Sequence, residues 1–184
     1  PWLARVPRRV GLDSDGRGWP NTIRVAHDVG ARRPEADVYL DIATALGVPI
    51  ATRRPSFAPT AAHVREAATL LSGLGGHRPV VALHVGGGVN PGMALPEKRW
   101  PPERFGALAA RLAERGAAVV WLGGQDDTTA AARAIAAASR GLVHATDGDA
   151  PMVDACGRLS LGGTAAAIAA CDAYVGSDTG ASHL

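Results

Sequence analysis

The residues best suited to chemistry stand at the end of the chain, in the stretch Ser177-Asp178-Thr179-Gly180-Ala181-Ser182-His183. Hydroxyls, a carboxylate and an imidazole follow directly on an apolar run, Ala173 to Gly176. Where a buried strand turns into a helix, backbone N–H groups and small side chains surround one point, which suits a phosphate or a sugar hydroxyl. A lone Asp178 would be read as a helix N-cap. The clustering of polar groups around it favours a ligand-binding role instead.

A second candidate is the glycine-rich stretch His84-Val85-Gly86-Gly87-Gly88, with Lys98 and Arg99 further along the chain. Glycines directly after a strand let backbone amides approach an anion closely, and the two cations can fold back to neutralise it. The stretch is neither a Walker loop, which needs G-K-[ST], nor a G-x-G-x-x-G fingerprint, because Asn90-Pro91 stands where the helix should start. The residues themselves leave an anion site and a flexible loop equally open.

A third candidate is Gly123-Gly124-Gln125-Asp126-Asp127, which follows the apolar run Val119 to Leu122. An acidic residue after a strand of a parallel sheet commonly holds a pair of ribose hydroxyls. The same residues serve equally well as the N-cap of the next helix, with their charge favoured by the helix dipole. Both interpretations stay open.

Alternating apolar and amphipathic stretches predict the elements that position these residues. Short apolar runs indicate buried strands, and stretches at helical spacing that end in Gly indicate helices. The expected strands are 6–12, 80–84, 119–122, 142–144 and 173–176, the expected helices 34–47, 60–74, 101–115, 129–139 and 161–171, and the expected loops 13–20 and 146–157. This order predicts an α/β fold with a parallel sheet, whose ligands bind in the loops after His84, Leu122, His144 and Val175.

The composition is that of a globular protein of 184 residues, 47% of them hydrophobic and 4% aromatic. The net charge is +2, but residues 1–65 contain 10 basic against 6 acidic residues. That excess is either ordinary solvated surface or a face for a phosphorylated or membrane-borne partner. No apolar run reaches the roughly 20 residues of a membrane span. No signal peptide is visible, but the chain begins at Pro1, so we expect the true start to be missing.

The two cysteines, Cys156 and Cys171, are too few and too far apart for a C-x-x-C motif or a disulfide scaffold. We expect buried free thiols in a reducing compartment. His84, His144 and His183 include no pair with ligand spacing on one element, so no metal site is expected.

Taken together, these stretches resemble glycosyltransferase family 9, the heptosyltransferases and their relatives in bacterial lipopolysaccharide assembly. The resemblance rests on pieces in family order: His84 to Gly88 followed by Lys98-Arg99-Trp100-Pro101-Pro102, then Val119 to Asp127, Cys156 to Leu161, and Ala170 to His183. Residues 1–65, notably Pro7 to Gly11, are similar to the later half of the family's amino-terminal domain. The K-R-W-P and D-T-G-A-S-H elements are specific as a pair. The long loop from Val89 to Pro96 leaves the register between the glycines and Lys98 open.

The resemblance implies the GT-B architecture, with two Rossmann-like domains built on parallel sheets. Residues 1–76 would be the later part of the amino-terminal, acceptor-side domain plus a linker. Residues 77–184 would be a truncated carboxy-terminal domain that binds a nucleotide sugar. The implied activity is inverting transfer of a heptose or related sugar from a nucleotide-diphosphate donor to lipopolysaccharide or another glycan.

The resemblance also implies roles for single residues. Lys98 would neutralise the donor diphosphate, and Asp127 or Asp126 would bind the ribose hydroxyls. Asp178 and His183 would line the sugar and phosphate side, which makes Lys98 and Asp178 the expected catalytic residues. The expected phosphate cradle consists of Gly86, Gly87, Asp178, Thr179 and Gly180.

No metal or other cofactor is expected, because a lysine and a helix N-terminus can stabilise the leaving nucleotide. The expected partners are the nucleotide sugar and a glycolipid or glycan acceptor, and not nucleic acid. The implied location is cytoplasmic, with peripheral contact at the inner face of the bacterial inner membrane. The family's general base falls before Pro1, so the chain as given is expected to be an inactive fragment.

Three alternatives remain beside this interpretation. Another GT-B enzyme, such as a nucleotide-sugar epimerase, would share the fold. An inactive relative would hold a nucleotide without catalysis. A NAD-dependent Rossmann enzyme is disfavoured, because the dinucleotide fingerprint is missing.

Overall fold

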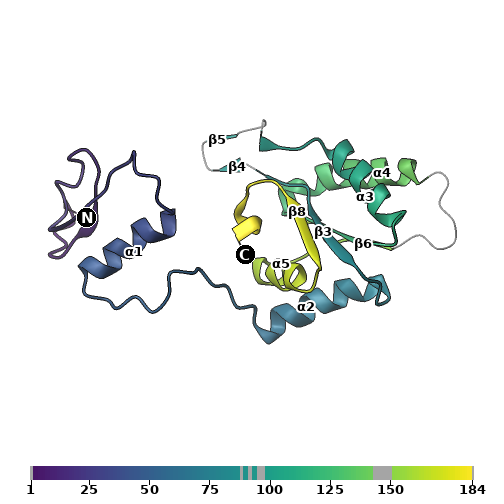
Figure 1. The fold of residues 1–184 in the computed structure, drawn as a ribbon, viewed down its shortest axis with the longest axis horizontal. Helices are drawn as coiled ribbons and strands as arrows, with labels where there is room; N and C mark the ends of the chain where they lie inside the picture. The colour runs from purple at the N-terminus through teal and green to yellow at the C-terminus, as the bar shows by residue number, and fades with distance from the viewer. Residues whose placement is uncertain (1, 88, 91–92, 95–97, 143–150, 184) are drawn as a thin grey trace. The chain divides into compact units, whose positions relative to one another are not determined.

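The computed structural model describes residues 2–87, 89–90, 93–94, 98–142 and 151–183. Its contacts divide the chain into two compact units, Pro1–Ser56 and Phe57–Leu184 (Figure 1). The sequence-based boundary at residue 76 lies later than this division. The reason is the helix α2 (Ala61–Leu71), which packs on α5 (Leu161–Ala169) and therefore groups with the second unit.

The first unit is a parallel strand pair with one helix. Strand β1 (Val10–Asp13) pairs with β2 (Ile23–Ala26), with Val10 opposite Ile23. Helix α1 (Glu35–Ala45) confirms the helix predicted over 34–47. Strand β2 was not predicted, because four residues with alternate exposure after a long loop give a weak pattern.

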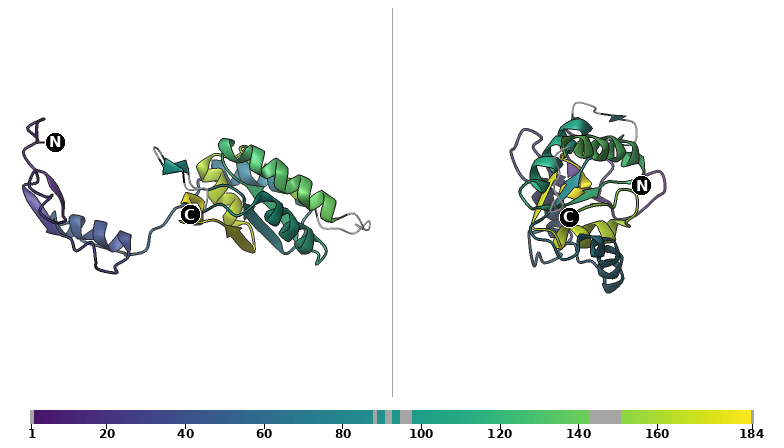
Figure 2. Two further views of the ribbon diagram at one scale, coloured as in Figure 1. Left: turned by 90° about the horizontal axis from the view of Figure 1, so that it is seen from above. Right: turned by 90° about the vertical axis from the view of Figure 1, so that its right-hand side faces the viewer.

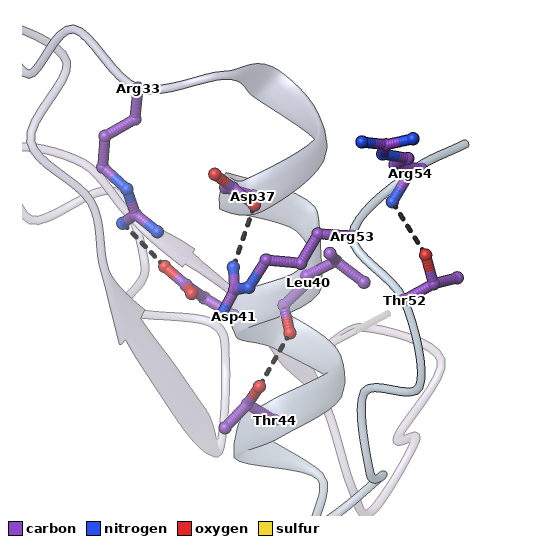
Figure 3. Close-up of polar contacts among 8 residues, drawn as sticks. All are labelled: Arg33, Asp37, Leu40, Asp41, Thr44, Thr52, Arg53 and Arg54. Carbon is purple, nitrogen blue, oxygen red and sulfur yellow. Dashed lines mark hydrogen bonds and ion pairs between the residues drawn. The ribbon is translucent and has the colours of Figure 1, made fainter.

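Ion pairs connect α1 to the segments that precede and follow it (Figure 3). Arg33 Nη1 lies 2.8 Å from Asp41 Oδ2, and Arg53 Nη1 lies 2.9 Å from Asp37 Oδ1. The Arg33 guanidinium holds the pKa of Asp41 below its usual range. All four side chains reach solvent, so the pairs orient the flanking segments more than they stabilise the unit.

The second unit contains a parallel sheet with the strand order β7-β6-β3-β8 (Figure 1). Its strands are β3 (Val80–His84), β6 (Ala118–Leu122), β7 (Met152–Asp154) and β8 (Ala173–Gly176). The central strands β3 and β6 are buried along their whole length, which explains their continuous apolar sequences. The strands predicted over 80–84, 119–122 and 173–176 are confirmed. The last of them was expected to be buried, but β8 is largely exposed, because it lies at the edge of the sheet.

Helices cover both faces of this sheet. The right view of Figure 2 shows α3 (Pro102–Ala113) and α4 (Thr128–Gly141) on one side and α2 and α5 on the other. The sheet has a hydrophobic core on each face, and alternate residues of β3 belong to one or the other. Val81 and Leu83 pack with Phe105 of α3, whereas Val80 and Ala82 pack in the core beneath α2 and α5. Small residues such as Ala134 let α3 and α4 approach closely.

The remaining short elements are the 3-10 helices η1 (Ser72–Leu74), η3 (Gln125–Asp127) and η4 (Gly180–His183), and the antiparallel pair β4 (Val89–Asn90) and β5 (Met93–Ala94). The pair of β4 and β5 lies within the long loop from Val89 to Pro96 that the sequence indicated. Among the helices of the described residues, none combines the length and apolarity that crossing a bilayer requires.

The strand predicted over 142–144 lies mostly outside the described residues. Leu142 forms a turn at the end of α4, whereas Val143, His144 and the first part of the expected loop, up to residue 150, are not described. The strand beside β6 is β7, inside the stretch 146–157 that the sequence predicted as loop. Three residues that include Asp154 carry little apolar pattern, so their strand character comes from pairing with β6.

The cysteines behave as expected of free thiols. Cys156 is buried and Cys171 is partly buried, and neither forms a disulfide. Burial raises the pKa of Cys156 to about 12 and that of Cys171 to about 11. Both sulfurs are therefore protonated and unreactive at neutral pH.

Candidate functional site

A cleft of about 630 Å³ opens at the carboxyl ends of β3, β6 and β8. Parallel α/β sheets bind ligands at this edge. Most of the predicted site residues line it: Gly87, Lys98, Asp127, Asp178, Thr179, Gly180 and His183. Gly86 is not among the residues that line the cleft, but it packs closely against Asp127, which does line it. The folding of the chain thus brings the three separate sequence motifs to one place.

Asp178 is the centre of the charged part of the cleft. Its Oδ2 lies 3.2 Å from Lys98 Nζ, and its Oδ1 lies 3.5 Å from His183 Nε2. The hydrogen bond and charge of Lys98 hold the pKa of Asp178 below its usual range, with a smaller contribution from His183. All three side chains are largely exposed, so they are available to a ligand.

The sequence suggested that an α-helix begins near Gly180. The structure has the 3-10 helix η4 at this position instead. Ser182 closes this turn on Thr179: its Oγ donates to the Thr179 carbonyl at 2.6 Å and accepts from the Thr179 N–H at 3.3 Å. The turn keeps Asp178, Thr179 and Gly180 together at the mouth of the cleft.

In the glycine-rich stretch, neighbouring residues occupy the space that a side chain at Gly86 or Gly87 would need. A Cβ atom at Gly86 would overlap Oδ2 of Asp127, and one at Gly87 would lie 3.2 Å from Cγ2 of Thr179. These two glycines therefore allow three loops to approach one another, a role that the sequence could not distinguish from flexibility.

Arg99 also folds back onto this stretch, as its position after Lys98 suggested. Its Nε donates a hydrogen bond to the Gly87 carbonyl at 2.6 Å. Lys98 and Arg99 both line the cleft, so two cations stand beside the glycines. This arrangement supports the anion-site interpretation over the flexible loop.

Asp127 and Asp126 have different surroundings. Asp127 stands at the N-cap position of α4, as the sequence suggested, but its side chain makes no cap hydrogen bond to that helix. Its Oδ2 instead accepts from the Gly124 N–H at 2.9 Å and so caps the preceding 3-10 turn η3. Asp126 is exposed and lines the same cleft. Either carboxylate can meet a ligand, but Asp127 also orders the turn that follows β6.

His84 is a site residue to which the sequence analysis assigned no role of its own, although it begins the predicted glycine-rich stretch. It is 8% exposed, lines the cleft at the end of β3, and its Nδ1 has no hydrogen-bond partner among the described residues. Burial lowers the pKa of His84, although the nearby Asp127 charge opposes the shift, so the imidazole is neutral at pH 7. The sequence feature that could have identified His84 as a site residue is its position at the end of a predicted buried strand.

One wall of the cleft comes from the segment around the start of α5, which the sequence analysis did not assign to the site. Leu159, Leu161 and Thr164 line this wall. Its two leucines make it more apolar than the charged part around Asp178. Within the described parts of the chain, no group of three or more His, Cys, Asp or Glu residues could hold a metal ion.

Comparisons with known proteins give the family. The model of "Glycosyltransferase family 9 (heptosyltransferase)" matches residues 1–184. No curated protein matches the chain.

Two solved structures are similar over nearly the whole chain. A family 9 glycosyl transferase from Veillonella parvula has a TM-score of 0.71 and 25% identity, over 99% of this chain and 48% of its own. An ADP-heptose lps heptosyltransferase II from E. coli has a TM-score of 0.66 and 24% identity, over 98% of this chain and 53% of its own. The chain therefore spans about half the length of each neighbour.

These likenesses confirm the predicted α/β fold of GT-B type, with parallel sheets. Because the family model covers every residue, the chain belongs to glycosyltransferase family 9, the heptosyltransferase family.

Proposed function

We propose that this chain carries the donor-binding side of an inverting glycosyltransferase. The enzyme would move a heptose or related sugar from a nucleotide-diphosphate donor to lipopolysaccharide or another glycan acceptor. The observation that carries the proposal is the cluster of Lys98, Arg99 and His183 in one cleft with Asp178. The E. coli neighbour, named an ADP-heptose lps heptosyltransferase, supports heptose as the sugar.

The mechanism follows from how a diphosphate leaves. Displacement at the anomeric carbon inverts its configuration and puts negative charge on the departing phosphates. Lys98 would neutralise that charge, helped by the amides of the Asp178–Gly180 turn and of Gly86 and Gly87. Preformed charges and dipoles in such a cleft stabilise the developing anion without reorganising. We therefore propose that transfer needs no metal or other cofactor, which activity in the presence of EDTA would test.

Asp178 organises the side chains around it. It holds Lys98 at 3.2 Å and His183 at 3.5 Å with different oxygens. A bound diphosphate would share these two side chains with Asp178. Asp127 or Asp126 would bind the ribose hydroxyls, since both line the cleft beside Gly124.

We further propose peripheral contact with an anionic membrane surface at the cytoplasmic face of the inner membrane. The support is the basic excess in residues 1–65, 10 basic against 6 acidic residues, together with a lipid-linked acceptor. Arg8 is exposed in the first unit.

Donor titration followed by product analysis tests the function. ADP, UDP and GDP sugars are titrated by calorimetry into the full-length protein, and products are then analysed with and without acceptor. The expected result is binding of one donor and an inverted glycoside that appears only with acceptor. Binding without any product indicates an inactive relative, and a changed sugar without acceptor indicates an epimerase. Absence of binding to all three donors contradicts the proposal.

A further inference from the structure

The start of α5 is held by a carboxylate from another helix. Glu66 lies on α2, and its Oε1 accepts from the Ser160 N–H while its Oε2 accepts from the Ser160 hydroxyl, both at 2.6 Å. Ser160 Oγ in turn accepts from the Gly163 N–H at 3.0 Å. Ser160 is the N-cap of α5, so three hydrogen bonds in series fix the first turn of this helix.

This arrangement is a capping box divided between two helices. In the usual box, an acidic side chain three residues after the cap reaches back to the cap's own N–H. In α5 that position is Gly163, which has no side chain. A Cβ atom there would lie 2.6 Å from the carboxyl carbon of Glu66, and one at Gly162 would overlap the His63 ring. The two glycines thus leave room for α2 to supply the missing carboxylate.

The residues around this cap form a wall of the cleft. Leu159 precedes Ser160, Leu161 follows it, and both line the cleft together with Thr164 of the first turn. Leu161 is 66% exposed, so little packing of its own holds it in place. Glu66 does not line the cleft, yet it makes two of the three hydrogen bonds that set this wall.

We propose that Glu66 is a positioning residue for the donor site, acting through Ser160 on the wall formed by Leu159, Leu161 and Thr164. The inference rests on the proposed function, because it takes the ligand of the cleft to be a nucleoside diphosphate or its sugar. A carboxylate at a helix N-terminus also complements the dipole of α5, which adds to the rigidity of the turn. Loss of the carboxylate lets the first turn of α5 fray and leaves the cations around Asp178 unchanged.

The test compares Glu66→Ala and Glu66→Gln with Arg65→Gln, the matched control on the neighbouring, exposed residue of α2. In the full-length protein, the Kd for the nucleoside diphosphate of the preferred donor is measured by calorimetry, with KM and kcat for transfer. Loss of a helix cap predicts a Kd and a KM that rise roughly threefold to thirtyfold in Glu66→Ala. We expect kcat to change less than twofold, a smaller effect in Glu66→Gln, and none in Arg65→Gln.

Two further measurements separate positioning from folding. Hydrogen exchange at residues 161–164 should accelerate in Glu66→Ala and remain unchanged in α3. Ser160→Ala removes the hydroxyl from the same chain of bonds and should be non-additive with Glu66→Ala. If Glu66→Ala does not fold, Ser160→Ala and Glu66→Gln give the same comparison.

The outcomes distinguish this inference from the proposed function. A wild-type protein that binds no nucleoside diphosphate overturns both. The Glu66 role alone is overturned if the wild-type protein binds the nucleoside diphosphate but Glu66→Ala and Arg65→Gln do not differ. The quantities compared are the Kd and the rate of hydrogen exchange at residues 161–164. A lower thermal stability with an unchanged Kd shows that the cap is purely structural and likewise overturns it.

Discussion

Lys98 Nζ lies 3.2 Å from Asp178 Oδ2, although the two residues are 80 positions apart in the chain. The pair connects the segment that leads into α3 with the loop that leaves β8. The Lys98 side chain is 50% exposed and that of Asp178 is 70% exposed, so the pair adds little to folding stability. A lysine held loosely by one carboxylate is well placed to exchange that partner for a phosphate.

Replacing Lys98 by alanine should therefore reduce catalysis far more than stability. We expect the loss of about 2–4 kcal/mol in transition-state stabilisation, which corresponds to a fall in kcat/KM of roughly 30-fold to 1,000-fold. The free energy of unfolding should change by less than about 0.5 kcal/mol. Arg104→Ala, at an exposed position of α3, serves as the control. Full turnover in Lys98→Ala would remove Lys98 from the proposed mechanism.

Gly86→Ala should destabilise the second unit through Asp127. The added methyl group overlaps Asp127 Oδ2, so the carboxylate must leave its hydrogen bond to the Gly124 N–H. We expect a loss of about 1–3 kcal/mol in the free energy of unfolding, measured by urea titration. Combination with Asp127→Ala removes the overlap, so the double variant should lose less than the sum of the single variants. Strict additivity would mean that the two residues do not interact.

The neighbouring acids Asp126 and Asp127 form a natural matched pair. Asp127→Ala should lower the free energy of unfolding by about 1 kcal/mol, because it removes the cap on Gly124 N–H. Asp126→Ala should leave the unfolding free energy unchanged, because Asp126 is exposed. Calorimetric titration with the preferred donor and with its 2′-deoxyribose analogue then identifies the acid that contacts the ribose. Equal stability of the two variants would contradict the capping role.

His84 should make folding stability depend on pH near neutrality. Burial lowers the pKa of His84 from its ordinary value of 6.5, so protons bind the unfolded chain more readily than the folded one. The stability that this difference provides is complete above about pH 6.5 and falls as the pH drops through the folded pKa. His84→Gln should flatten the stability profile between pH 5 and 7, measured by urea titration. The exposed His77→Gln is the control, and equal slopes in the two variants would refute this source of pH dependence.

Charge reversal at Arg8 tests the membrane proposal. Arg9 is a poorer target, because its Nε donates to the Pro20 carbonyl at 2.5 Å and its loss would alter the local fold. We expect Arg8→Glu to weaken binding to vesicles rich in anionic lipid on the order of tenfold, with the effect reduced at high salt. Arg111→Glu, on α3 of the second unit, controls for net charge. Equal loss in both variants would indicate a nonspecific charge effect.

Much of the second unit could be predicted from the sequence alone. The apolar runs at 80–84 and 119–122 predicted the central strands, because a strand buried on both faces needs an apolar side chain at every position. The K-R-W-P and D-T-G-A-S-H elements predicted the family. Strands β2 and β7 escaped prediction, because short, half-exposed strands owe their structure to their partners and not to their own pattern.

The relationships within the site depended on the tertiary structure. The contact of Asp127 with Gly86, the pair of Lys98 with Asp178, and the cap that Glu66 provides for Ser160 all join residues far apart in the chain. The spacing of apolar residues within a segment predicts which of its own side chains are buried. Which segments meet is decided by the crossovers and by the strand order β7-β6-β3-β8, which places the loops after β3, β6 and β8 at one edge of the sheet.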